Sequence, residues 1–141
     1  MLIVLGWVTT PVNRRFMNQE AKDIIEDFLI DYMGTKVFFN DDGFISYRIS
    51  EQDKIVYVAD YFVPRSSRNM RKGVSLMRDF LMYINEIRPD IHTLLGDVQI
   101  NLPHSLRRLE LFSKMGAELL CSDGNAIAVQ YDLKKGPFSI K

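Results

Sequence analysis

The fold of this chain is decided by residues 63–74, which read VPRSSRNMRKGV. The segment follows a run rich in Val, Tyr and Phe that predicts a strand at Lys54–Val63. It leads into apolar residues at steps of three and four, which predict a helix over Asn69–Arg88 that Pro89 ends. A strand joined by a short turn to a long helix indicates an α/β unit.

The flanking elements follow at short spacing, and we expect one domain over residues 1–141. The strongest turn signal is Asn40-Asp41-Asp42-Gly43, which predicts a hairpin. Asn101 caps a third predicted helix, and Gly116 ends it. The remaining predicted elements are a first helix from about Arg15 to Met33 and strands at Leu2–Val8, Thr35–Phe39, Phe44–Ile49, His92–Ile100, Ala117–Cys121 and Ala126–Leu133. We expect the first helix to be continuous and to bury one apolar stripe at steps of three and four, formed by Met17, Ala21, Ile24, Ile25, Phe28, Leu29 and Tyr32.

This order, β-α-β-β-β-α-β-α-β-β, predicts an α/β (α+β) fold. The central strand–helix–strand unit favours a parallel pair, and the hairpins around it add antiparallel neighbours. We therefore expect a mixed central sheet of about seven strands with helices on both faces.

The composition is that of a globular chain, because disordered chains have fewer apolar residues than the 47% found here. The formal net charge is zero, so we expect no broad attraction to nucleic acid or to anionic lipid. The single cysteine, Cys121, excludes an internal disulfide and favours a reducing, cytoplasmic location. Leu2–Val8 is too short to cross a membrane, and no group of side chains has the spacing of a metal site.

The turn at Arg68–Gly73 is the first candidate functional feature. The first amides of a helix lack partners within the helix and lie at the positive end of its dipole, so this position binds phosphate well. Arg65, Arg68, Arg71 and Lys72 add positive charge, and Gly73 lets a backbone or a ligand come close. The same residues are also typical of an ordinary exposed turn, so on this stretch alone both interpretations stay open.

The stretch from Val63 to Met77 resembles motif A of the GNAT acetyltransferase superfamily, in which R/Q-x-x-G-x-G/A follows the fourth strand. Arg68, Gly73 and Leu76 take its first, last and aliphatic positions. Asn101 follows the fifth strand, as a frequent Asn of the family does. Residues 111–117, LFSKMGA, resemble the family's L-Y-x-x-x-G-F, and the element order also agrees, so the resemblance covers nearly the whole chain.

The resemblance implies an acyl-CoA ligand, acetyl-CoA or a relative, in a V-shaped gap between the fourth and fifth strands, with no metal. Pantetheine would pair with the backbone near Phe62 and Val63, and the pyrophosphate would rest on amides of the motif. Ser105 would line the opposite wall, near the thioester. The cofactor-binding residues implied in this way are Phe62, Val63, Arg68, Asn69, Arg71, Lys72, Gly73, Val74, Asn101 and Ser105.

The resemblance also gives candidates for proton transfer, which amine acylation needs. Asp60 is the candidate general base, because several family members place a carboxylate on the fourth strand, although an outward-facing polar residue would look the same. Tyr57 and Tyr61 are weaker alternatives. His104, in the first turn of the third helix, is a second candidate for moving a proton.

Three departures from the family pattern leave a second interpretation open. Arg71 stands at the motif's first Gly, Pro64 is shifted by one position, and Phe112 replaces a Tyr that often protonates the leaving thiolate. The first interpretation is an acetyl-CoA-dependent N-acetyltransferase acting on a protein lysine, an N-terminus or a small amine. The alternative is a catalytically degenerate, protein-binding member of the fold, for example a phage protein acting on the host or in the virion.

The acceptor and the partners are less defined by the sequence. The first predicted helix has an acidic face that could attract a basic acceptor, and such a face is equally typical of a solvated helix. Its carboxylates are Glu20, Asp23, Glu26, Asp27 and Asp31. A homodimer through sheet edges is expected by analogy alone, and we expect no binding of nucleic acid.

Overall fold

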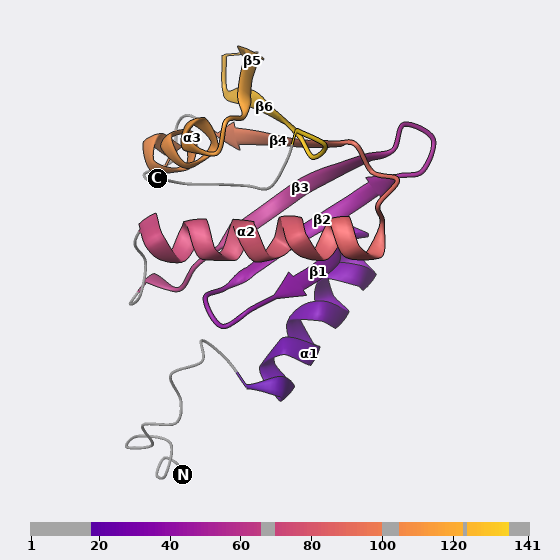
Figure 1. Cartoon of the computed structure of the whole chain (residues 1–141). Helices are drawn as coiled ribbons and strands as arrows, with labels where there is room; N and C mark the ends of the chain where they lie inside the picture. The colour runs from indigo at the N-terminus through magenta and orange to yellow at the C-terminus, as the bar shows by residue number, and fades with distance from the viewer. Residues whose placement is uncertain (1–17, 66–69, 100–104, 123, 136–141) are drawn as a thin grey trace.

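The computed structural model describes residues 18–65, 70–99, 105–122 and 124–135 (Figure 1). The predicted strand Leu2–Val8 lies outside these residues. From Thr35 onward the predicted order of elements is confirmed, with boundaries that shift by a few residues. The elements are α1 (Gln19–Phe28), the π-helix η2 (Leu29–Met33), β1 (Lys36–Phe39), β2 (Phe44–Ser50), β3 (Ile55–Phe62), α2 (Met70–Ile87), β4 (Thr93–Gln99), α3 (Ser105–Lys114), β5 (Glu118–Ser122) and β6 (Ala126–Asp132).

The strands form one mixed sheet in the order β1-β2-β3-β4-β6-β5. β3 and β4 pair in parallel, and the other neighbours pair antiparallel. The described part of the sheet has six strands where the sequence predicted about seven, and the difference is the predicted strand outside the described residues. The predicted mixed α/β architecture, with a central parallel pair, is confirmed.

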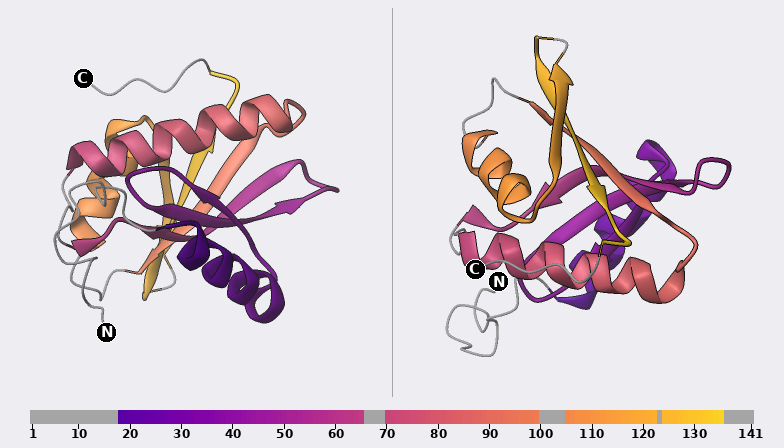
Figure 2. Two further views of the ribbon diagram at one scale, coloured as in Figure 1. Left: turned by 90° about the horizontal axis from the view of Figure 1, so that it is seen from below. Right: turned by 45° about the horizontal axis from the view of Figure 1, so that its top comes forward.

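The core lies between the sheet and α2, and α2 lies along one face of the sheet (Figure 1). α1 lies on the opposite face of the sheet from α2 (Figure 2). Phe80 of α2 is fully buried, and its ring lies 5.2 Å from Tyr47 and 5.7 Å from Phe38, centroid to centroid. Burying a side chain of this size stabilises the fold by about 1.5–3 kcal/mol. Other fully buried core residues are Ile45, Val56, Leu76, Met77, Ile84, Leu94 and Val129.

The first helix differs from the prediction of one continuous helix with a buried apolar stripe. Asn18 caps α1 by accepting a hydrogen bond from the amide of Ala21, and a π-helical turn follows the ten residues of α1. Gly34 ends this turn in the left-handed conformation that glycine adopts most easily. Of the described stripe residues only Leu29 is buried, because the helix presents a different side to the sheet. The stripe prediction was therefore wrong for Ile24, Phe28 and Tyr32, which are exposed.

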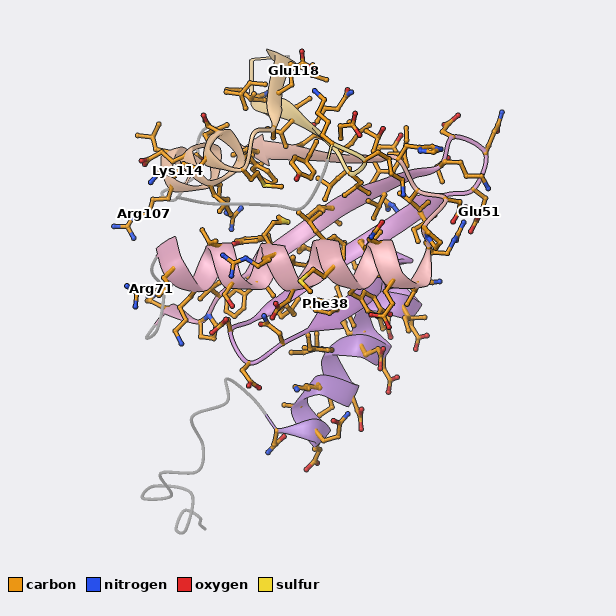
Figure 3. The ribbon with its side chains drawn as sticks, viewed as in Figure 1. Phe38, Glu51, Arg71, Arg107, Lys114 and Glu118 are labelled. Atoms are coloured by element: carbon orange, nitrogen blue, oxygen red, sulfur yellow. The ribbon has the colours of Figure 1, made fainter. Side chains whose placement is uncertain are left out.

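A group of ion pairs ties two connections together at one end of the sheet. The Arg88 guanidinium donates to both carboxylate oxygens of Glu51, at 2.8 and 2.6 Å, and to both of Asp90, at 3.0 and 2.8 Å. This arrangement joins the β2–β3 turn to the segment between α2 and β4. Arg88 holds the pKa of Glu51 and of Asp90 below their ordinary values. Glu51 lies at the opposite end of the molecule from Arg71 and Arg107 (Figure 3).

Candidate functional site

β3 and β4 diverge at the end of the molecule where α2 and α3 begin. Their parallel pairing runs from Ile55 opposite Thr93 to Val58 opposite Gly96, and then stops. β3 continues to Phe62 and β4 to Gln99 without pairing to each other. Ligands of open α/β sheets bind beyond the carboxyl ends of neighbouring strands, so this divergence is the candidate site.

A bulge in β3 accompanies the divergence. Ser46 of β2 faces Asp60 and the next residue, Tyr47, faces Val58, so Ala59 has no partner on β2. One extra residue bends a strand and increases its twist. The bulge therefore lies where β3 turns away from β4, and it changes the direction in which Asp60 and its neighbours point.

Tyr61 joins the diverging part of β3 to the first turns of α2. Its hydroxyl donates a short hydrogen bond to the backbone carbonyl of Gly73. A Cβ atom at Gly73 would lie 2.6 Å from that hydroxyl oxygen, so any other residue here would require the Tyr61 hydroxyl to move. The sequence interpreted Gly73 as a point where a backbone or a ligand comes close, and in the structure the approaching group is the Tyr61 hydroxyl.

Burial raises the pKa of Tyr61 above its ordinary range, so its hydroxyl stays protonated at neutral pH. The hydroxyl is also engaged with Gly73. In this structure Tyr61 is therefore a structural donor, which disfavours the role of general base considered among the alternatives above.

α3 contacts the same part of β3 through Arg108. A terminal nitrogen of the Arg108 guanidinium lies 3.5 Å from the backbone carbonyl oxygen of Tyr61, at the limit of a hydrogen bond. This arginine was not predicted to belong to the site, because a backbone acceptor 47 positions away leaves no local sequence pattern. Its guanidinium reaches the strand edge that β4 leaves unpaired.

Ser105 holds the start of α3 against the end of β4. Its side chain is buried, and its hydroxyl donates a short hydrogen bond to the backbone carbonyl of Gln99. This hydrogen bond orients the start of α3 relative to the end of β4, so Ser105 positions the helix.

The hairpin turn between β1 and β2 packs against the same region, a neighbour that sequence reasoning missed. A Cβ atom at Gly43 would lie 1.9 Å from the backbone oxygen of Phe62. The Asp42 carboxylate forms an ion pair with the Lys72 ammonium at 3.2 Å, and the Asn40 amide donates to Asp79 at 2.8 Å. The turn thus fastens the end of β3 to α2.

Asp60 lies on the other face of the sheet from this cluster. Successive residues of a strand point to opposite faces, and its neighbour Tyr61 points to α2. The fully buried hydroxyl of Ser46 donates to the Asp60 carboxylate at 2.8 Å, while Asp60 itself is exposed. The carboxylate is therefore oriented by β2 and open to solvent.

The other predicted site residues divide into three groups. Val63 and Val74 are buried, so only their backbone can meet a ligand. Arg71 is exposed near the start of α2, and Figure 3 shows it at the same end of the molecule as Arg107 of α3. Phe62 is partly exposed, and its ring lies 5.4 Å from that of Phe44. Outside the described residues lie Arg68, Asn69, Asn101 and His104.

Two kinds of structural feature are absent from the described residues. No group of three His, Cys, Asp or Glu side chains in this part of the chain could hold a metal ion. None of its helices combines the length and the apolar character needed to cross a membrane.

The sequence matches no protein-family profile and no curated protein. The structure, however, is similar to solved acetyltransferases. A spermidine N-acetyltransferase chimera, from Vibrio cholerae and hSSAT, has a TM-score of 0.59 and 10% identity over 82% of this chain and 77% of that one. A Bacillus subtilis acetyltransferase in complex with CoA has a TM-score of 0.55 and 14% identity over 81% and 85%.

A ribosomal-protein-alanine N-acetyltransferase from Brucella melitensis has a TM-score of 0.55 and 16% identity over 81% of this chain and 77% of that one. Identities this low establish the fold alone. The chain adopts the fold of the GNAT acyl-CoA N-acyltransferases, which confirms the fold that the sequence resemblance implies.

Proposed function

We propose that this protein is an N-acetyltransferase that uses acetyl-CoA as donor and an amine as acceptor. The observation that carries the proposal is the divergence of β3 and β4 beyond Val58 and Gly96, next to the start of α2. Strand edges that do not pair with each other and the amino end of a long helix are complementary to the two polar parts of acyl-CoA, its amides and its phosphates.

The proposed donor site begins on the edge of β3. The carbonyl of Tyr61 is an acceptor that β4 leaves available, and Arg108 contacts it at 3.5 Å. An amide of the pantetheine chain would donate a hydrogen bond to this carbonyl, and the Arg108 guanidinium would then turn toward the phosphates of the donor. The partly exposed Phe62 would cover the apolar part of the chain.

The proposed phosphate site lies at the start of α2. Arg71 and Lys72 supply positive charge there, with Gly73 and Val74 in the same turn. Arg68, Asn69 and Asn101 join this set on the strength of the sequence resemblance. A phosphate that approaches Lys72 competes with Asp42, so we expect the ion pair at 3.2 Å to open when the donor binds.

Acetyl-CoA supplies a thioester whose acetyl group passes to the amine nitrogen while its thiolate leaves. Asp60 is the proposed general base, because its carboxylate is exposed beside the diverging end of β3 and is oriented by Ser46. It would take the proton that the amine loses, directly or through water. Phe112 cannot protonate the thiolate, but a thiol with a pKa of about 8.5 leaves without a dedicated acid. His104 is kept as a second proposed group for proton movement.

The acceptor is proposed to be a primary or secondary amine on a protein or a small molecule. The solved structures that share this fold include a spermidine N-acetyltransferase chimera and a ribosomal-protein-alanine N-acetyltransferase, which act on these two kinds of amine. The acceptor would approach Asp60 from the sheet face opposite α2.

A catalytically degenerate, protein-binding role is the second candidate. Two contacts favour it, because they already engage groups that the donor would use. Arg108 contacts the Tyr61 carbonyl, and Asp42 neutralises Lys72. Under this alternative, acetyl-CoA neither binds nor reacts.

The test is an acyl-transfer assay with three acceptors: a peptide with a free N-terminus, an N-terminally blocked lysine peptide, and spermidine. Release of free thiol and the mass of the acceptor are followed together. We expect one acceptor to be acetylated, and we expect Asp60→Asn to slow transfer by about 10²-fold with unchanged acetyl-CoA affinity. Binding of acetyl-CoA without acetyl transfer to any of the three acceptors would contradict the proposed enzymatic role. Absence of both acetyl-CoA binding and acetyl transfer would also contradict the proposed donor site.

A further inference from the structure

The outer side of α1 and η2 carries a row of exposed apolar side chains. Ile24, Phe28 and Tyr32 follow one another at intervals of four residues and are 63%, 53% and 77% exposed. The rings of Phe28 and Tyr32 lie 5.3 Å apart, so both point to the same side. We call these three residues the apolar row. Large apolar side chains that gather on one face of a helix commonly mark a contact surface.

A row of carboxylates runs beside the apolar row. Asp23, Asp27 and Asp31 each stand one position before a member of the apolar row, and all three are exposed. We call them the acidic row. Residues at this spacing stack along one side of a helix, so the acidic row forms a continuous edge to the apolar row.

The π-helical turn keeps the two rows straight. Four residues of an α-helix rotate about 40° more than a full turn, so a row with this spacing drifts around the axis. The wider turn of η2, Leu29–Met33, compensates this drift at Asp31 and Tyr32. Buried Leu29 and Thr35 hold the turn in place: the Leu29 carbonyl accepts from the Thr35 amide at 3.1 Å.

The charge of this segment is one-sided. From Gln19 to Met33 the chain has five carboxylates and a single basic residue, Lys22. The Lys22 ammonium lies 5.6 Å from the centroid of the Phe39 ring on β1, so its charge is directed to the sheet. Nothing basic in the segment therefore lies within the acidic row itself.

We propose that the apolar row and the acidic row together are a docking surface for a basic amphipathic helix of a partner protein. The partner would place apolar residues at steps of three and four on the apolar row, and Lys or Arg residues opposite the acidic row. The surface spans about 12 Å, or roughly two helical turns, which suits a partner helix of three or four turns. The proposal does not depend on acyl transfer.

Charge complementarity selects this occupant. Two copies of this surface facing each other would bring like carboxylates together, which opposes a symmetric dimer through this face. Leu2–Val8 of the same chain contains no basic residue and so offers no counter-charge. A basic amphipathic helix satisfies both the apolar and the acidic row.

The probe is a synthetic helical peptide of about 18 residues, with leucines on one side and lysines beside them. Fluorescence anisotropy measures its binding to the full chain at low salt and at about 0.15 M salt. We expect saturable binding that weakens with salt, and none for the peptide in which every lysine is replaced by glutamate. Phe28→Ser and Asp27→Lys should each weaken binding about tenfold or more.

Two positions on α2 provide matched controls. Met82 is 65% exposed, and Glu86 lies four residues further along the same helix and is also exposed. Met82→Ser and Glu86→Lys change an apolar and an acidic surface residue in the same way, and they should leave peptide affinity unchanged. Circular dichroism of all four variants confirms that each is folded.

Several results would overturn the proposal. One is no saturable binding of the lysine peptide, and another is equal loss in the α2 controls. A wild-type dimer that Phe28→Ser converts to a monomer would identify a second copy as the occupant. Trp7, the sole tryptophan, lies in Leu2–Val8. A red shift of its emission in Phe28→Ser would identify this chain's own segment as the occupant.

Discussion

Replacing Gly73 by alanine should destabilise the protein, although alanine is the better helix former. Gly73 lies inside α2, where alanine would gain about 1 kcal/mol over glycine. The added Cβ, however, would lie 2.6 Å from the Tyr61 hydroxyl oxygen. The hydroxyl would have to move by several tenths of an ångström and would lose its bond to the Gly73 carbonyl.

The magnitude follows from these opposing terms. An unsatisfied buried donor costs about 1–3 kcal/mol, and overpacking adds about 1–3 kcal/mol. After subtracting the helix gain of about 1 kcal/mol, we expect Gly73→Ala to lower the free energy of unfolding by about 1–5 kcal/mol. In Tyr61→Phe the nearest remaining ring atom, Cζ, lies 3.7 Å from the new Cβ, which is ordinary contact. Gly73→Ala should therefore stabilise that variant, by up to about 1 kcal/mol.

The assay is a double-mutant cycle of urea unfolding for wild type, Gly73→Ala, Tyr61→Phe and the pair. A change of sign between the two backgrounds, with a coupling energy of at least about 2 kcal/mol, is the expected result. If Gly73→Ala has the same effect in both backgrounds, within about 0.5 kcal/mol, the contact with Tyr61 does not explain the glycine.

Two further predictions concern stability. Gly43→Ala should lower the free energy of unfolding by more than about 3 kcal/mol or abolish folding, because the new Cβ would lie 1.9 Å from the backbone oxygen of Phe62. A soluble, cooperatively folding variant with near wild-type stability in urea unfolding would contradict this. The Arg88 guanidinium lowers the pKa of Glu51 and of Asp90 below their ordinary values of 4.5 and 3.8. The two carboxylates therefore contribute fully to stability above about pH 5, and this contribution is lost as the pH falls through the lowered pKa values. Thermal melts at low salt should show a smaller acid-induced fall of Tm in Arg88→Met than in wild type, and an equal fall would mean that these exposed pairs contribute nothing.

Much of the fold could be predicted from local patterns. The alternating strands, the long helix before Pro89 and the Asn40–Gly43 turn are each specified by residues within a few positions of one another. The first helix shows where such patterns fail. The helix has apolar residues on neighbouring sides, and their periodicity does not tell which side packs against the sheet. In the structure Leu29 is buried and Phe28 is exposed.

The contacts of the candidate site were less predictable, because they join distant residues through backbone atoms. The turn glycine Gly43 was predicted, but its packing against the Phe62 carbonyl depends on how the hairpin folds over β3. The contact of Arg108 with the Tyr61 carbonyl crosses 47 positions and uses an acceptor that every residue has. The sequence indicates the region of the candidate site, and the tertiary fold determines which groups meet there.

The most direct test of the proposed donor site is a calorimetric titration of acetyl-CoA into wild type, Arg71→Glu and Arg78→Glu. The two arginines are exposed on the same side of α2, two turns apart, so each variant makes the same change of charge at a different distance from the diverging strands. We expect binding by wild type, at least about tenfold weaker binding by Arg71→Glu, and nearly unchanged binding by Arg78→Glu. No binding by wild type at millimolar acetyl-CoA, or equal loss in both variants, would contradict it.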